Sequence, residues 1–255
     1  TQQVSPDTGT TINTYDSGGN LKTSNDARNK TGTYSYDALN RVTSLAYNDQ
    51  TITYTYDTGT NGNGRLTQLA STGATMSYSY DSNGRVLTKT QLSNGNTKTI
   101  SYQYNSAGQL SQMTTPSNKV IVYGYTNGKV SNITVNGVTL LSNVVYEPFG
   151  PVGGWTWGNS TLAVRTYDLD GRVGQIDSGD LRTYGWDAAS RITSILDAQN
   201  SSLDQSYDYD NLDRLTSVTK ANGNQAFTYD ANGNRLTYDD GAASSAYVVA
   251  GTSNR

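Results

Sequence analysis

The chain has 255 residues and a formal net charge of −3, and it contains neither histidine nor cysteine. This composition excludes disulfide bridges, zinc sites built from thiolates or imidazoles, and Ser-His-Asp or Cys-His catalysis. Because the charge is near neutral and no apolar run reaches the roughly 18 residues of a transmembrane helix, we expect no nucleic-acid partner and no membrane insertion.

Tyrosine supplies much of the apolar surface. Hydrophobic residues make up only 34% of the chain, but 20 residues are tyrosine. A tyrosine ring can be buried while its hydroxyl stays in water, so a sheet rich in Tyr, Thr, Ser and Asn can fold around a thin aliphatic core. Low net charge and many aromatics also argue against disorder.

A short unit recurs along the whole chain: Tyr-Asp, a few turn residues, then Arg or Lys and an aliphatic residue. In chain order the units begin at Tyr15-Asp16, Tyr36-Asp37, Tyr56-Asp57, Tyr80-Asp81, Tyr104-Asn105, Tyr125-Thr126, Tyr167-Asp168, Trp186-Asp187, Tyr209-Asp210 and Tyr229-Asp230. Each unit also contains a second turn, such as 93–96. One repeat of roughly 20 residues is therefore two strands and two turns, and consecutive repeats should form an antiparallel meander.

The segment 76–87 shows the turn that we expect in every unit. Asp81 can accept backbone N–H bonds two residues on, and Gly84 supplies the left-handed conformation that ends a three-residue loop. Asp81 then lies opposite Arg85, and each arginine after a turn, Arg65 and Arg235 included, should be neutralised by an aspartate opposite it. We interpret the recurring positions as structural anchors: Tyr36, Asp37, Tyr80, Asp81, Gly84, Arg85, Tyr167, Asp168, Gly171, Arg172, Tyr209, Asp210, Arg214, Tyr229, Asp230 and Arg235.

The same loop predicts the strand register. Tyr80 should lie opposite Val86, and Tyr78 opposite Thr88. After many turns, however, apolar residues stand three apart, as in the pair Val42 and Leu45. Strict alternation would place these on opposite faces, so either both faces are partly covered or a β-bulge intervenes; we favour the bulge.

The stretch 136–164 is atypical. It holds Pro148 and Pro151, which should interrupt or redirect the sheet because proline lacks the ladder donor. Trp155 and Trp157 should face the same way. With Trp186 they could form an exposed platform for glycans; alternatively they pack against neighbouring hairpins, which we favour because large aromatics are usually buried.

Paired carboxylates suggest two further hypotheses. Asp168 with Asp170, Asp208 with Asp210, and Asp239 with Asp240 could serve a glycosidase. However, an aspartate opens nearly every turn, so we expect no enzymatic role. The run 168–171 resembles the start of a calcium loop but lacks its later ligands, so we expect solvated turn carboxylates, with no metal and no cofactor.

The Tyr-Asp-x-x-Gly-Arg-aliphatic units, together with VVYEPFGPVGGWTWGN, RTYDLDGRV and FTYDANGNRLT, resemble the tyrosine-aspartate (YD) repeats of the Rhs family. Relatives include bacterial wall-associated proteins, C subunits of insecticidal toxin complexes and teneurins. The resemblance runs from about Tyr15 to Arg255. The family's Asp-Pro-x-Gly cleavage motif is absent, and Glu147-Pro148-Phe149-Gly150 echoes it only in part, which leaves autoproteolysis in doubt.

The resemblance implies an all-β fold in which antiparallel hairpin repeats form a long curved or spiralling sheet, part of a hollow shell. It implies a single repeat array over 1–255, and as partners the remainder of the parent chain, with further repeats and an enclosed toxin domain. It also implies a secreted or cell-surface location. The alternative from a different class is a surface adhesion module that binds glycans through its tryptophans.

Overall fold

The computed structural model describes residues 1–5, 8–148 and 150–248, so Phe149 and the end of the resemblance at Arg255 lie outside the described residues. Over these ranges the chain forms 24 strands and one short 3-10 turn, with no α-helix, which confirms the all-β prediction. None of the described elements is a helix long and apolar enough to cross a membrane.

The strands are β1 (Gln2–Ser5), β2 (Gly9–Tyr15), β3 (Leu21–Asn25), β4 (Thr31–Tyr36), β5 (Val42–Ala46), β6 (Thr51–Tyr56), β7 (Leu66–Ser71), β8 (Ala74–Tyr80), β9 (Val86–Ser93), β10 (Asn96–Tyr104), β11 (Leu110–Thr114), β12 (Val120–Thr126), β13 (Lys129–Val135), β14 (Val138–Tyr146), β15 (Val152–Trp157), β16 (Leu162–Tyr167), β17 (Val173–Asp177), β18 (Leu181–Trp186), β19 (Ile192–Asp197), β20 (Gln205–Tyr209), β21 (Leu215–Lys220), β22 (Gln225–Tyr229), β23 (Arg235–Asp239) and β24 (Ser244–Ala246). The 3-10 turn η1 (Ser201–Leu203) lies between β19 and β20.

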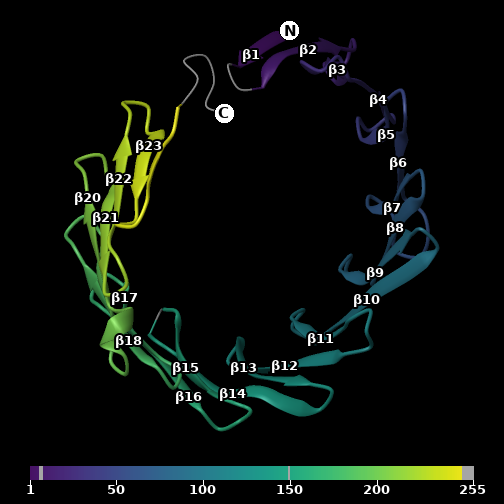
Figure 1. The fold of residues 1–255 in the computed structure, drawn as a ribbon. Helices are drawn as coiled ribbons and strands as arrows, with labels where there is room; N and C mark the ends of the chain where they lie inside the picture. Colours follow the sequence, from purple (N-terminus) through teal and green to yellow (C-terminus); the bar gives the residue numbers. More distant parts are fainter. Residues whose placement is uncertain (6–7, 149, 249–255) are drawn as a thin grey trace. The chain divides into compact units, whose positions relative to one another are not determined.

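The chain divides into two compact units, one of residues 1–123 with 135–137 and one of residues 124–134 with 138–255. In the first unit each strand from β1 to β12 pairs antiparallel with the next strand in the chain. In the second unit the same holds from β14 to β24 (Figure 1). Both are hairpin meanders, as predicted; a single array over the whole chain stays a prediction.

A β-bulge follows the turn in nine of the YD hairpins. In β8 and β9, Tyr80 lies opposite Val86 as predicted, but the next pair is Ser79 with Thr88, so Leu87 is the extra residue. The prediction that Tyr78 faces Thr88 was wrong for this reason: Tyr78 lies opposite Lys89. The same shift occurs in the hairpins β2–β3, β4–β5, β6–β7, β10–β11, β16–β17, β18–β19, β20–β21 and β22–β23.

The bulge explains why apolar residues stand three apart after the turn. Val42 lies opposite Tyr36 and Leu45 opposite Tyr34, so the extra residue brings both aliphatic side chains to the same face. We call this side of the hairpins, which carries the motif tyrosines, the tyrosine face. The predicted bulge is confirmed.

The two faces differ in chemistry. On the side opposite the tyrosine face, which we call the hydroxyl face, serine and threonine pair across strands; Ser79 and Thr88, for example, are joined by a hydrogen bond of 2.6 Å. The tyrosine face is mostly half-buried, and among the described apolar residues only Ala163 (2% exposed) and Val218 (6%) are buried. The predicted thin aliphatic core is what the structure shows.

The atypical stretch does not interrupt the sheet. Strands β14, β15 and β16 pair in order, and the difference is an additional register shift between Ser142 and Val145. The proline-rich turn keeps the geometry of the others, because the Glu147 N–H donates to the Pro151 carbonyl at 3.0 Å and the Gly150 N–H to the Glu147 carbonyl at 3.0 Å. The prolines therefore lie in a turn, where no ladder hydrogen bond requires a donor from their backbone nitrogen.

Candidate functional site

The YD turn is the most regular polar arrangement in the chain. The Asp81 N–H donates to the Arg85 carbonyl at 2.9 Å, and the Gly84 N–H donates to the Asp81 carbonyl at 3.0 Å. Gly84 has φ +79°, the left-handed conformation that was predicted. Asp81 Oδ1 accepts the N–H groups of Asn83 and Arg85, each at 2.9 Å, and Oδ2 accepts Arg85 Nε at 2.7 Å. Both carboxylate oxygens of Asp81 therefore accept hydrogen bonds from donors within the turn.

The aspartate–arginine pair recurs, with two exceptions. The ion pairs Arg41–Asp37, Arg172–Asp168, Arg191–Asp187 and Arg214–Asp210 all measure 2.7 Å. The prediction was wrong for Arg65, which donates to backbone carbonyls of its longer loop, and for Arg235. In the last motif an extra residue, Asn234, takes the place opposite Asp230 and donates to its carboxylate at 2.8 Å.

These contacts lower the pKa of the turn carboxyls. For Asp187, the backbone N–H of Arg191 and then the Arg191 side chain lower the pKa, against the opposing effect of burial. Asp37 follows the same pattern with Arg41. A carboxylate held ionised by its own turn is not a general acid, so these aspartates act as structural acceptors.

Sequence reasoning missed a contact that joins each repeat to the one before it. The motif tyrosine donates its hydroxyl to the backbone carbonyl of the first branched aliphatic residue after the preceding turn; a cation comes just before this residue in most units, but Asn20 precedes Leu21 and Pro151 precedes Val152. This bond is found for Tyr36 with Leu21, Tyr80 with Leu66, Tyr104 with Val86, Tyr146 with Val130, Tyr167 with Val152, Tyr209 with Ile192 and Tyr229 with Leu215. Trp186 replaces the tyrosine in one unit and donates its indole N–H to Val173 at 2.8 Å.

The backbone ladder explains why the carbonyl is available. Between β9 and β10 the pairing ends at Thr88 with Ser101. Beyond that point the ring of Tyr104 reaches across, and its hydroxyl meets the Val86 carbonyl at 2.9 Å. A side-chain donor therefore satisfies an acceptor that the ladder leaves open.

The cation of the preceding turn covers the same ring. Arg85 Cζ lies 4.5 Å from the centroid of Tyr104. The equivalent stacks are Arg41 on Tyr56, Arg65 on Tyr80, Lys129 on Tyr146, Arg172 on Trp186, Arg191 on Tyr209 and Arg214 on Tyr229, at 4.4 to 5.7 Å. We call the combination of stacked cation and bonded tyrosine the repeat clamp. The sequence signal for the repeat clamp was the cation that recurs after the turns. The turn alone does not require a cation at this position.

The three tryptophans do not form a flat platform. The rings of Trp155 and Trp157 meet edge to face, with centroids 5.3 Å apart and planes 85° apart. Trp157 donates to Ser178 at 3.0 Å, and Trp186 belongs to the repeat clamp. Nothing in this geometry favours stacking on a sugar, so glycan binding stays a prediction.

The paired aspartates lie in turns or bond to neighbouring strands. Asp168 bonds to Arg172, Asp208 accepts Ser217 at 2.7 Å on the hydroxyl face, and Asp239 and Asp240 accept backbone N–H groups of residues 241–243. Within the described ranges no group of three or more Asp or Glu residues is arranged to hold a metal ion.

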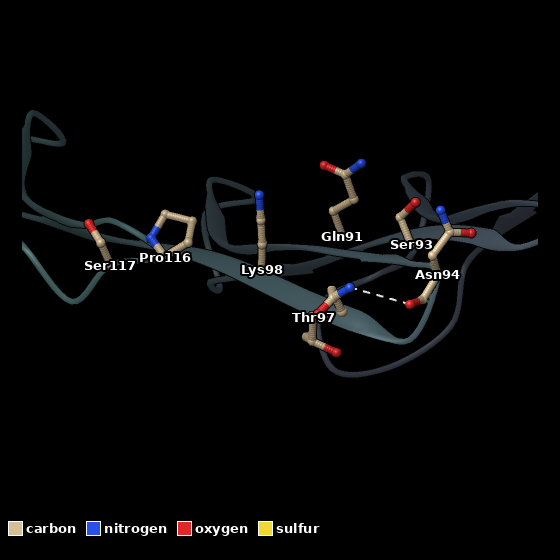
Figure 2. Close-up of a pocket in the computed structure, with 8 residues that line it drawn as sticks. Gln91, Ser93, Asn94, Thr97, Lys98, Pro116 and Ser117 are labelled. Carbon is tan, nitrogen blue, oxygen red and sulfur yellow. Dashed lines mark hydrogen bonds between the residues drawn. The ribbon is translucent and has the colours of Figure 1, made fainter.

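A polar cavity of about 860 Å³ lies beside the β9–β10 hairpin (Figure 2). It is lined by amide and hydroxyl side chains, with Lys98 as its one cation, and Asn96 donates to the Asn94 carbonyl at 3.3 Å. This lining offers no nucleophile paired with a base, so it has the character of a solvated groove between turns.

The structure thus defines a class: an all-β repeat protein built from hairpins that are joined by a repeated clamp. The profile of the RHS Repeat family matches residues 15–51 and 205–244. The chain therefore contains RHS repeats in these two segments, in agreement with the resemblance to the YD repeats of the Rhs family.

Comparison with solved structures gives the same fold. The crystal structure of TcdB2-TccC3-Cdc42 matches with a TM-score of 0.88 at 17% identity, covering 100% of this chain and 16% of that chain. The crystal structure of TcdB2-TccC3 matches with a TM-score of 0.88 at 17% identity, covering 100% and 17%. The chain spans about a sixth of the length of these relatives. No curated protein sequence matches it.

Proposed function

We propose that the chain is a structural wall segment of a larger Rhs-type protein, which encloses a toxin or effector domain and is secreted or displayed at the cell surface. The observation that carries this proposal is the repeat clamp. At six steps among the described residues it joins a hairpin to the next by both a hydrogen bond and a cation–π stack, and a wall of many short hairpins depends on contacts between neighbouring hairpins.

Two further observations support a wall. The turn carboxylates are committed to their own turns, which leaves them no role in hydrolysis. The fold matches one stretch of the much longer TcdB2-TccC3 chains, one of which was crystallised without its hypervariable C-terminal region. On this proposal the partner of the chain is the remainder of its own parent protein.

Labelling of single cysteines tests enclosure, because the chain has no cysteine of its own. Ile52→Cys places a thiol on the tyrosine face of β6, and Thr53→Cys places one on the hydroxyl face of the same strand. Each is introduced into the parent protein with any other cysteines replaced. The thiols are then treated with N-ethylmaleimide or with a maleimide that carries a long polyethylene glycol chain.

In a closed wall, the small reagent should label both positions, whereas the large reagent should label only the outward-facing one. The result that contradicts enclosure is equal labelling of both thiols by the large reagent. Circular dichroism of each variant confirms that neither substitution disturbs the strands.

A further inference from the structure

Arg165 breaks a row of aromatic side chains on the tyrosine face. The position two residues before the motif aromatic is also aromatic in eight strands: Tyr34, Tyr54, Tyr78, Tyr102, Tyr123, Tyr184, Tyr207 and Phe227. In β16 this position is Arg165, on the same face as Tyr167 because side chains two apart in a strand point the same way. A cation just after the atypical stretch therefore lies over the ring of one of its tryptophans, Trp155.

The guanidinium of Arg165 has no acceptor among the described residues. Its Cζ lies 5.1 Å from the ring centroid of Trp155, and its Nε is buried without a hydrogen-bond partner. The indole Nε1 of Trp155 is also a buried donor without a partner. On the same hairpin, Arg172 is 2.7 Å from Asp168. Arg65 and Arg235 also lack a carboxylate partner, but each donates to a carbonyl or hydroxyl oxygen, so among the described arginines only Arg165 has no acceptor at all.

The buried Nε of Arg165 and the buried Nε1 of Trp155 have almost no accessible surface, so an incoming acceptor can reach only the terminal nitrogens of the guanidinium, Nη1 and Nη2, which are also unpaired. A partly desolvated charge attracts an opposite charge more strongly than a hydrated one. A guanidinium can hold a carboxylate through two parallel hydrogen bonds. Charge complementarity therefore identifies a carboxylate as the occupant.

We propose that Arg165 and Trp155 form a docking site for an acidic side chain of a polypeptide segment that lies against the tyrosine face. The edge-to-face pair of Trp155 and Trp157 supplies apolar surface for residues that flank the acid. The cavity of about 550 Å³ beside Trp157 does not include Arg165, so it would not enclose a small carboxylate bound to this arginine. A polypeptide needs no such enclosure, because residues that flank its acidic side chain add contact area. The inference holds whether or not the parent protein encloses a domain.

Isothermal titration calorimetry with a defined peptide tests the proposal. The probe is an acetylated and amidated peptide of Leu, Ser and Asp; its control replaces every Asp by Asn, and N-acetyl-aspartate represents a small carboxylate. Arg165→Gln removes the unpaired guanidinium. Arg182→Gln is the matched variant, because it removes one positive charge from the tyrosine face of β18. Unlike Arg165, Arg182 already has a carboxylate partner, Asp180, at 3.1 Å.

The acidic peptide should bind the unmodified chain saturably, and Arg165→Gln should weaken binding at least about tenfold, whereas Arg182→Gln should change it less than about threefold. Arg165→Lys should restore only part of the affinity, because lysine keeps the charge but not the paired geometry. Equal weakening by both glutamine variants, equal binding of the Asn peptide, equal affinity for N-acetyl-aspartate, or no saturable binding would each overturn the proposal. Matching thermal midpoints for the variants show that folding is intact.

Discussion

Gly84 and Gly171 occupy the same position of the YD turn but have different surroundings, which allows the repeat clamp to be measured. Both have positive φ, +79° and +76°. A Cβ on Gly171 would meet no atom within 4 Å, whereas a Cβ on Gly84 would overlap the guanidinium of Arg65. That guanidinium lies 5.7 Å from the ring centroid of Tyr80 and donates to a backbone carbonyl at 2.8 Å.

Gly171→Ala should therefore cost only the left-handed conformation, about 1–2 kcal/mol of unfolding free energy. Gly84→Ala should cost that amount and also displace Arg65, because the arginine side chain can make room for the new Cβ only by moving off the Tyr80 ring. A cation–π contact at a partly exposed site and a net hydrogen bond are each worth about 0.5–1.5 kcal/mol, so the excess should be about 1–2 kcal/mol.

The assay is urea unfolding followed by circular dichroism, with both alanine variants made in the unmodified chain and in Arg65→Ala. In the Arg65→Ala background the excess cost of Gly84→Ala should vanish, because there is no guanidinium left to displace. The reasoning is refuted if the two glycine variants cost the same in the unmodified chain, or if the excess survives the removal of Arg65.

Three further predictions follow from the same contacts. Tyr80→Phe should lower the unfolding free energy by about 1 kcal/mol through loss of the hydroxyl-to-carbonyl bond, and more than Tyr78→Phe, whose hydroxyl meets only a methionine sulfur; urea titration of both variants decides this. Ser190 has φ +62°, so Ser190→Gly should raise the thermal midpoint more than Asn40→Gly, because asparagine tolerates a left-handed φ better than serine; equal shifts would contradict this. The turn carboxyls have lowered pKa values in the fold, so their stabilisation is present above the unfolded pKa of about 4 and is lost as pH falls through the folded values; a midpoint that stays constant from pH 5 to about pH 2.5 would show that the turn bonds contribute nothing.

The turns were predictable because their causes are local in sequence. Asp81, Gly84 and Arg85 lie within five residues, and each has a conformational or hydrogen-bonding preference that the turn uses. The bulge was also visible, because apolar residues three apart can share a face only if one residue is skipped. The exact partner of Tyr78 was missed because the register was counted without applying that skip.

The repeat clamp was not predictable from one unit, because its two halves lie in different repeats. Tyr104 and Val86 are separated by 18 residues, and the sequence does not show where the ladder between their strands ends. The same limit applied to Arg165, whose place in the aromatic row is visible in the sequence but whose lack of an acceptor depends on neighbouring strands. Where the pairing between repeats ends depends on the packing of side chains from neighbouring strands, which local propensity does not encode.

The neutral copy of the motif at Asn105 shows that the turn and the clamp are separate functions of the repeat. Asn105 Nδ2 donates to Gln109 Oε1 at 3.0 Å and Asn105 Oδ1 accepts the Gln109 N–H at 2.9 Å, so the hairpin closes without an ion pair. Gln109, however, carries no cation to place over the ring of the next unit. Since few side chains are fully buried, the stability of such an array depends on contacts between neighbouring hairpins. Aspartate and glycine thus specify each hairpin, whereas arginine and tyrosine set how firmly one hairpin holds the next, and sequence can vary the second without losing the first.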